Sequence, residues 1–332
     1  MHSRAMNTPP LSLPQRTSDS HSESVHFIRL EDGRRLAYAE FGERQAYPLF
    51  HFHSHGSSRL EAASLHQAAK RAGFRLIAVD RPGVGLSDPH RGSDATSFAR
   101  DMLLLAQKLG CQRYGLIACG GGLASALAFA DLSGARATLL SGLSCAVPCT
   151  DTRSSLAQTM LRCVAKHLLQ GAIILRHWQA SSALETRLQR LIDSFSYADR
   201  RMFANPAMLQ LLTVDLTEAL RQGAGGVAQD TAQQFKPLPL ELSRLSLPCH
   251  FWLGSAEDAS VRQRTEHLVS QLPQGTVHQL ANRGRYFYMR HADDIFASAN
   301  QQLGRTLNRV VHKAHFAFAQ NTREQTAVAA TR

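Results

Sequence analysis

Buried strands alternate with amphipathic helices along most of this sequence, and that order constrains the fold more than any other feature. An Asp32-Gly33 pair between two short apolar runs predicts a β-hairpin near the start. Repeated strand and helix units then predict a parallel sheet with helices on both faces. We expect strands at 47–53, 75–80, 113–119, 137–143, 248–253 and 276–280, and helices at 59–72, 97–109, 123–132, 261–272 and 293–311.

The alternation stops after Ser144, where helical periodicity continues without strands. We therefore expect an α/β core formed by 25–144 and 245–312, interrupted by an inserted helical cap at 145–244. An apolar stripe on the first inserted helix is typical of packing rather than of a ligand or membrane surface. The stripe contains Leu156, Met160, Leu161, Val164, Leu168 and Leu169.

Both ends of the chain are expected to lie outside this core. Residues 1–24 are rich in Ser, Thr and Pro and predict a disordered leader, whereas 313–332 predict a weakly ordered basic tail. The net charge of +11 is dispersed, and no helix-turn-helix, zinc-finger or RNA-stacking motif accompanies it. We expect no nucleic-acid partner, and interpret the charge as favouring solubility.

The composition favours a globular protein of the cytoplasm. Hydrophobic residues make up 44% of the 332 residues, which is too many for a disordered chain. The apolar stretches are shorter than the roughly 18 residues that a membrane span needs. The six cysteines form no C-x-x-C pair, so we expect reduced thiols and a cytoplasmic location.

A sharp turn is predicted where the strand at 113–119 runs into Gly120-Gly121-Gly122 and then a helix rich in small residues. Such a turn presents the residue at its tip to the end of the sheet where ligands bind. We expect Cys119 at this tip. A helix N-terminus lowers the pKa of a thiol, so Cys119 is a candidate nucleophile.

Three motifs resemble the α/β-hydrolase superfamily, in its branch of esterase-like and haloperoxidase-like members. They are His53-Ser-His-Gly-Ser-Ser-Arg59 for the family's H-G-x-P-G-S-R loop, Asp80-Arg-Pro-Gly-Val-Gly-Leu-Ser-Asp88 for its D-R-P-G-x-G-x-S-D turn, and Ile117-Ala-Cys-Gly-Gly121 for its G-x-S-x-G elbow. The resemblance implies an α/β-hydrolase fold, with a sheet, an N-terminal antiparallel hairpin and an inserted helical cap.

The resemblance also implies roles for individual residues. Cys119 takes the place of the usual serine, Asp258 that of the acid, and Arg285 that of the usual histidine. The N–H groups of His55 and Gly120 are expected to form an oxyanion hole. Arginine stays protonated and cannot act as a base, so Arg285 is expected to hold a carboxylate, a thiolate or Asp258 instead. Three further residues are expected to line the pocket: His53, Ser54 and Ile117.

Three functions are open on this evidence. The first is an enzyme that hydrolyses, transfers or cyclises an ester or thioester through Cys119, acting on a small, apolar acyl compound without a cofactor. The second is a catalytically degenerate protein with the same fold that binds a small apolar ligand or has a regulatory role. The third is a cofactor-free or metal-dependent lyase using His51, His53 and His55, although no recognised metal spacing supports a metal. The oligomeric state is open, with a homodimer as one option.

Overall fold

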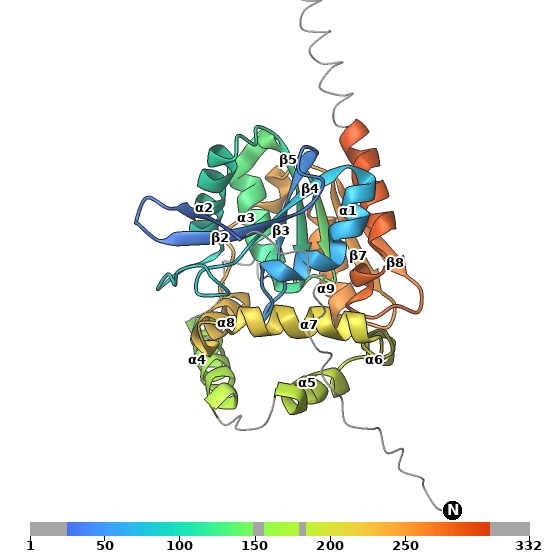
Figure 1. The fold of residues 1–332 in the computed structure, drawn as a ribbon. Helices are drawn as coiled ribbons and strands as arrows, with labels where there is room; N and C mark the ends of the chain where they lie inside the picture. Colours follow the sequence, from blue (N-terminus) through green and yellow to red (C-terminus); the bar gives the residue numbers. More distant parts are fainter. Residues whose placement is uncertain (1–24, 149–155, 179–183, 306–332) are drawn as a thin grey trace, which may run out of the picture.

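An eight-stranded, mostly parallel sheet runs through the described part of the chain, which comprises residues 25–148, 156–178 and 184–305 of the computed structural model (Figure 1). The strand order is β1-β2-β4-β3-β5-β6-β7-β8. Strand β2 pairs antiparallel with β1 and β4, and all other pairs are parallel. The predicted fold class is confirmed. The strands are β1 (His26–Arg29), β2 (Arg35–Gly42), β3 (Tyr47–Phe52), β4 (Phe74–Val79), β5 (Tyr114–Cys119), β6 (Ala137–Leu143), β7 (Cys249–Gly254) and β8 (Gly275–Leu280).

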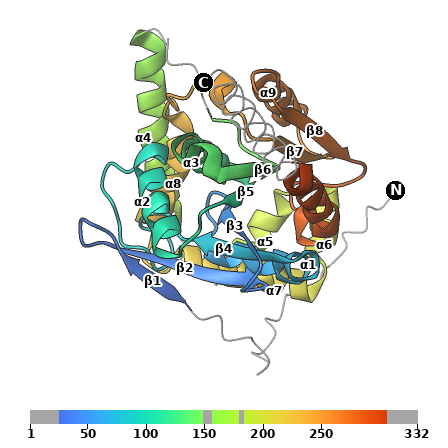
Figure 2. The same cartoon turned by 90° about the horizontal axis from the view of Figure 1, so that it is seen from above.

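Helices cover both faces of the sheet (Figure 2). One face packs against α2 (Ala95–Lys108), α3 (Leu123–Ser133) and α9 (Ala259–Ser270), and the other packs against α1 (His66–Ala72) and a helix at 292–305. Each face buries its own apolar cluster, so the strands are apolar on both sides, as parallel sheets require.

The single helix expected at 59–72 is divided into two elements. A 3-10 helix, η1 (Arg59–Leu65), comes first, and α1 follows it. The side chain of Ser58 caps η1 by accepting a hydrogen bond from Leu60 N, while the Arg59 N–H donates to Asp80 at 2.7 Å. These bonds hold the start of η1 against the loop after β4.

Within the described residues, five α-helices lie between β6 and β7 in the chain. In Figure 1 they sit beneath the sheet, with α7 running across the end at which the parallel strands terminate. They are α4 (Leu156–Trp178), α5 (Leu184–Asp193), α6 (Tyr197–Phe203), α7 (Pro206–Ala219) and α8 (Ala224–Thr231). Function-bearing loops at the carboxyl ends of parallel strands therefore face these helices.

The apolar stripe on α4 is not a packing surface within the described residues. Met160, Leu161, Val164 and Leu168 are between 55% and 69% exposed, because α4 contacts α8 and the segment after it through other positions. The packing prediction is wrong for these four residues. None of the described helices is long and apolar enough to cross a membrane. The predicted leader and basic tail lie outside the described residues.

Candidate active site

The turn after β5 is built from three glycines, and its tip is Gly120. Gly120 has φ +48°, in the left-handed region that favours glycine, whereas Cys119 continues the strand with φ −104° and ψ 135°. The prediction of Cys119 at the tip is therefore wrong by one residue. In a nucleophile elbow the reactive residue stands at the strained tip, with a small residue two positions before it and another two positions after it. Here those two small residues are Ala118 and Gly122. A Cβ on Gly122 would collide with the Phe52 carbonyl oxygen, so that position requires glycine.

Two side chains fill the space in front of Gly120, where a larger residue at that position would project. A Cβ built on Gly120 would lie 2.8 Å from Ser54 Oγ and 2.9 Å from Arg285 Nη2. The structure thus brings Gly120, Ser54 and Arg285 together. Ile117, predicted to line the pocket, is instead fully buried in the core of the sheet.

The Arg285 guanidinium has no hydrogen-bond acceptor or ion-pair partner in the part of the chain that the structure describes. Protein atoms crowd around the guanidinium, but Arg285 is exposed to solvent, and its Cζ lies 5.7 Å from the centre of the Tyr286 ring. Burial acts to lower the pKa of Arg285, but two tyrosines and two carboxylates outweigh it and raise that pKa: Tyr286, Tyr288, Glu61 and Glu257. Arg285 is therefore a cation whose guanidinium N–H groups have no acceptor among the described residues.

Helix α6 fixes the backbone that carries Arg285. The buried Asp199 carboxylate accepts hydrogen bonds from the backbone N–H groups of Arg285 and Tyr286, each at 3.0 Å. The Ser196 hydroxyl donates to the same carboxylate at 2.7 Å. Gly284 must be glycine, because a Cβ there would collide with Asp199. The inserted helices therefore help to set the position of Arg285.

The acid that faces the site is Glu257, one residue before the predicted Asp258. Glu257 accepts hydrogen bonds from the Ser144 hydroxyl at 2.7 Å and from the last backbone N–H of β7 at 2.6 Å, and burial raises its pKa. Asp258 is exposed and caps α9 by accepting a hydrogen bond from Ser260 N at 2.7 Å, which lowers its pKa. The expected ion pair between Asp258 and Arg285 is not formed.

Cys119 itself is fully buried beside His51 and Glu61. Its Sγ lies 3.5 Å from His51 Nε2, and burial together with Glu61 raises the pKa of the thiol well above its ordinary value. The thiolate, not the thiol, is the nucleophile, so this environment does not favour attack on a substrate. The nucleophilic role of Cys119 stays a prediction.

The three histidines of the lyase alternative, His51, His53 and His55, do not lie on one face of a strand, because β3 ends at Phe52. His51 lies in the core, while His53 Nε2 accepts a hydrogen bond from Arg81 N at 3.3 Å. The His55 ring packs against Gly121, and burial lowers the pKa of His55 to about 4, so this imidazole is neutral at pH 7. With residue 120 at the tip, the oxyanion N–H that the elbow geometry would use is that of Gly121, not that of Gly120.

Four buried carboxylates pin the inserted helices onto the loops at this end of the sheet. On α8, Asp230 accepts from Arg81 Nε at 2.5 Å and Nη2 at 2.8 Å. On α7, Asp215 accepts from Ser58 N at 2.9 Å and Oγ at 2.6 Å. Glu218 pairs with Arg59 at 2.8 Å, and Asp199 on α6 binds the Arg285 loop as described above. The helices are thereby held over the turn at Gly120.

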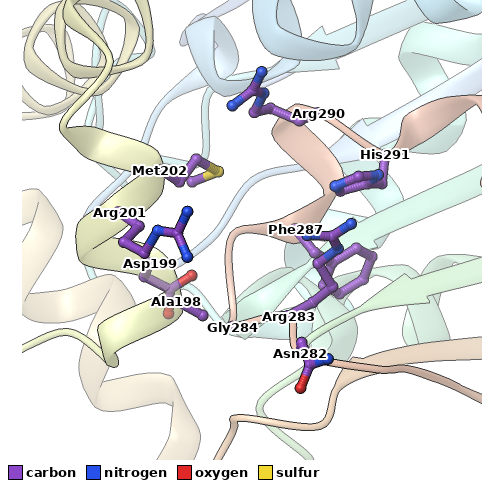
Figure 3. Close-up of a pocket in the computed structure, with 10 residues that line it drawn as sticks. All are labelled: Ala198, Asp199, Arg201, Met202, Asn282, Arg283, Gly284, Phe287, Arg290 and His291. Atoms are coloured by element: carbon purple, nitrogen blue, oxygen red, sulfur yellow. The ribbon is translucent and has the colours of Figure 1, made fainter.

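A cavity lies beside the loop that carries Arg285, between α6 and residues 282–291 (Figure 3). This basic cavity of about 210 Å³ is lined by Arg201, Arg283, Arg290 and His291, with Met202 and Phe287 on its walls. Burial, together with Arg283 and Arg290, lowers the pKa of His291. His291 thus belongs to the lining of this cavity (Figure 3).

Sequence reasoning missed Glu257, Glu61 and Tyr288. Glu61 accepts hydrogen bonds from Ser54 N at 3.0 Å and from the Tyr288 hydroxyl at 2.9 Å, directly beneath the site. The signal for Glu61 is its place two residues after Arg59, in η1, which follows the loop after β3. Nothing in the sequence distinguishes Tyr288 from its aromatic neighbours.

The fold and the turn after β5 together define a protein of the α/β-hydrolase class. The model of the "Alpha/beta hydrolase family" matches residues 49–299, and the chain belongs to this family. The resemblance of the three sequence motifs is confirmed at the level of the superfamily, a class of hydrolytic enzymes. A search of the curated proteins found no match.

Solved structures share the fold at low sequence identity. A bromoperoxidase from Bacillus anthracis is 17% identical with a TM-score of 0.66, over 85% of this chain and 100% of that chain. An enol-lactonase from Burkholderia xenovorans is 16% identical with a TM-score of 0.62, over 84% and 100%. A thermophilic esterase from Thermogutta terrifontis is 18% identical with a TM-score of 0.62, over 85% and 99%.

Proposed function

We propose that this hydrolase-family chain uses its cleft to recognise a small acyl compound that carries a carboxylate, with Arg285 as the anchor. One observation carries the proposal. Gly120 stands at the tip where an elbow presents its nucleophile, and the unpaired guanidinium of Arg285 fills the space in front of it. A planar guanidinium matches a carboxylate with two parallel hydrogen bonds.

The same site does not support covalent catalysis through residue 120. Glycine has no side chain to attack an ester, and arginine cannot take a proton at neutral pH. Glu257 Oε1 accepts hydrogen bonds from Ser144 and from the end of β7, and Arg285 stands where a base for Glu257 to orient would be needed. A bound carboxylate therefore meets a cation and no reactive group at the tip.

The surroundings favour a short ligand. Beside Ser54 and Tyr286 lies a cavity of about 30 Å³, closed by Leu211, Leu212 and other side chains of α7. A space of this size takes about one methyl group, so only the end of a short alkyl chain would enter it. The buried carboxylates that pin α7 and α8 make these helices a fixed cap rather than a moving lid.

Calorimetric titration of butyrate and methyl butyrate tests the proposal. Butyrate is expected to bind, and methyl butyrate to bind at least about 10-fold more weakly, since a hydrogen-bonded charge contributes about 1.5–3 kcal/mol. Arg285→Ala is expected to remove the preference for butyrate. The control is Arg283→Ala, which changes the basic cavity and leaves Arg285 in place. Equal binding of both compounds, or an unchanged preference in Arg285→Ala, contradicts the proposal.

A second candidate is acyl transfer or hydrolysis of an ester or thioester through Cys119. It is supported by the 3.5 Å separation of Sγ from His51 Nε2. Intact-mass detection after incubation with acyl p-nitrophenyl esters and acyl thioesters tests it: an adduct that is absent in Cys119→Ala establishes the thiol as nucleophile. Turnover without Cys119 dependence excludes it.

The domain boundaries, the cellular location and the oligomeric state are part of the same proposal. We place the hydrolase core at 25–144 and 245–312 and the cap at 145–244. A cytoplasmic location and the option of a homodimer stay predictions from the sequence.

A further inference from the structure

Three potential metal ligands converge at one buried point beneath the turn at Gly120. They are Cys119 Sγ from β5, His51 Nε2 from β3 and a Glu61 carboxylate oxygen from η1, and all three atoms lie within 4.8 Å of one another. The distances from His51 Nε2 to Cys119 Sγ and to Glu61 Oε2 are both 3.5 Å. Tetrahedral zinc with one sulfur, one nitrogen and one oxygen ligand separates those ligands by about 3.3–3.6 Å.

The arrangement does not suit a catalytic relay. In a nucleophile, histidine and acid triad the two ring nitrogens bond to different partners, so that the acid orients the base. Here the same nitrogen, His51 Nε2, faces both Cys119 and Glu61. His51 Nδ1 has no hydrogen-bond partner within the described ranges. Three donors directed at one point are the pattern of a coordination site.

The charge at this point is unbalanced without a cation. Within the described residues Glu61 has no arginine or lysine at ion-pair distance. A buried carboxylate without a counter-ion is costly, and a divalent cation would balance one carboxylate and one thiolate.

We propose that His51, Glu61 and Cys119 bind one divalent transition-metal ion of the zinc class, independently of any ligand at Arg285. Imidazole, carboxylate and thiolate are ligands that zinc accepts together. On binding, the Cys119 thiol loses one proton to solvent and forms the metal–sulfur bond, while His51 binds through the Nε2 lone pair. The bound site is electrically neutral, with two negative ligands and one dication.

A small cavity beside Glu61 offers a place for a fourth ligand. The cavity of about 30 Å³ described above is lined by Ser54, Glu61 and Tyr288, and it has room for a water molecule. The Tyr288 hydroxyl donates to the other Glu61 oxygen at 2.9 Å and so orients the carboxylate. Three protein ligands with a water in the fourth place are typical of zinc sites that remain open.

Metal replacement in the full chain tests this proposal. The protein is stripped with a chelator, titrated with zinc or cobalt(II), and measured for metal content and for its cobalt absorption spectrum. We expect about one equivalent per chain, and a thiolate-to-cobalt charge-transfer band in the near ultraviolet. Cys119→Ser is expected to lose the band, and Glu61→Gln to weaken metal affinity by more than about 100-fold.

The matched control is Cys145→Ser. Cys145 is also buried, but its Sγ bonds to the Ala118 carbonyl oxygen at 3.4 Å and lies outside the three-ligand group. This variant is expected to keep the full band. Wild-type protein that takes up less than about a tenth of an equivalent overturns the proposal, as does a folded cobalt protein without a thiolate band. Should Cys119→Ser fail to fold, these wild-type measurements and Glu61→Gln decide the question.

Discussion

Replacing Asp199 with asparagine tests how the inserted helices position Arg285. The Asp199 carboxylate accepts two backbone hydrogen bonds at 3.0 Å, from Arg285 and Tyr286. Asparagine has one oxygen, so one of these buried N–H groups would face an amide NH₂ and lose its acceptor. Leaving a buried donor unpaired costs about 1–3 kcal/mol, and the remaining bond loses the roughly 1 kcal/mol that a charged acceptor adds. Asp199→Asn should therefore lower the free energy of unfolding by about 2–4 kcal/mol.

Denaturant unfolding measures this change directly. The control is Asp193→Asn, since Asp193 is exposed at the end of α5 and its carboxylate accepts only from Gln189, so we expect a change within about 0.5 kcal/mol. Asp199→Asn should also weaken butyrate binding, because the backbone beneath Arg285 is no longer fixed. A loss of stability no larger than that of Asp193→Asn would refute the argument that Asp199 organises this loop.

Three further changes have defined outcomes. Gly120→Ala should lower the free energy of unfolding in denaturant by about 1–2 kcal/mol, because φ is +48° there. It should also weaken butyrate binding, because the new Cβ would displace Arg285. Wild-type stability and affinity would show that the tip tolerates a side chain. Burial and then Glu61 raise the pKa of Asp215 to about 7, above its value in the unfolded chain. Asp215 thus binds a proton more tightly in the folded state. Its contribution to the free energy of unfolding is full below about pH 4 and is lost as the pH rises through 7. Unfolding measured at pH 5 and pH 8 should show this loss in wild type and a smaller one in Asp215→Asn. Asp230→Ala removes the partner of the buried Arg81 and should cost about 3–5 kcal/mol, whereas a loss under 1 kcal/mol would show that water replaces the carboxylate.

Most of the fold could be predicted from the sequence, because the sequence patterns that indicate its strands, helices and turns are local. Apolar runs of strand length, the Asp32-Gly33 turn and helical spacing each predict one element, and the order of elements then predicts the parallel sheet. The hairpin and the strands agree with the structure. The exposed stripe on α4 was not predictable, because its apolar spacing is the same whether or not another element covers it.

The tip of the turn and the acid are each predicted one residue away from where the structure has them, for two different reasons. Any of the glycines at 120–122 can adopt a left-handed conformation, so the sequence does not show which of them forms the tip. Glu257 and Asp258 are adjacent acids, and which one faces inward depends on where β7 ends and where α9 is capped. The meeting of His51, Glu61 and Cys119 depends on tertiary packing of three separate elements.

The most direct test of the central claim is a crystal structure of the protein with bromoacetate or butyrate bound. The account predicts a carboxylate on the Arg285 guanidinium, with both oxygens within hydrogen-bond distance and the alkyl group directed towards the side chains of α7. A carboxylate found only in the basic cavity between Arg201 and Arg283, with none at Arg285, would contradict it.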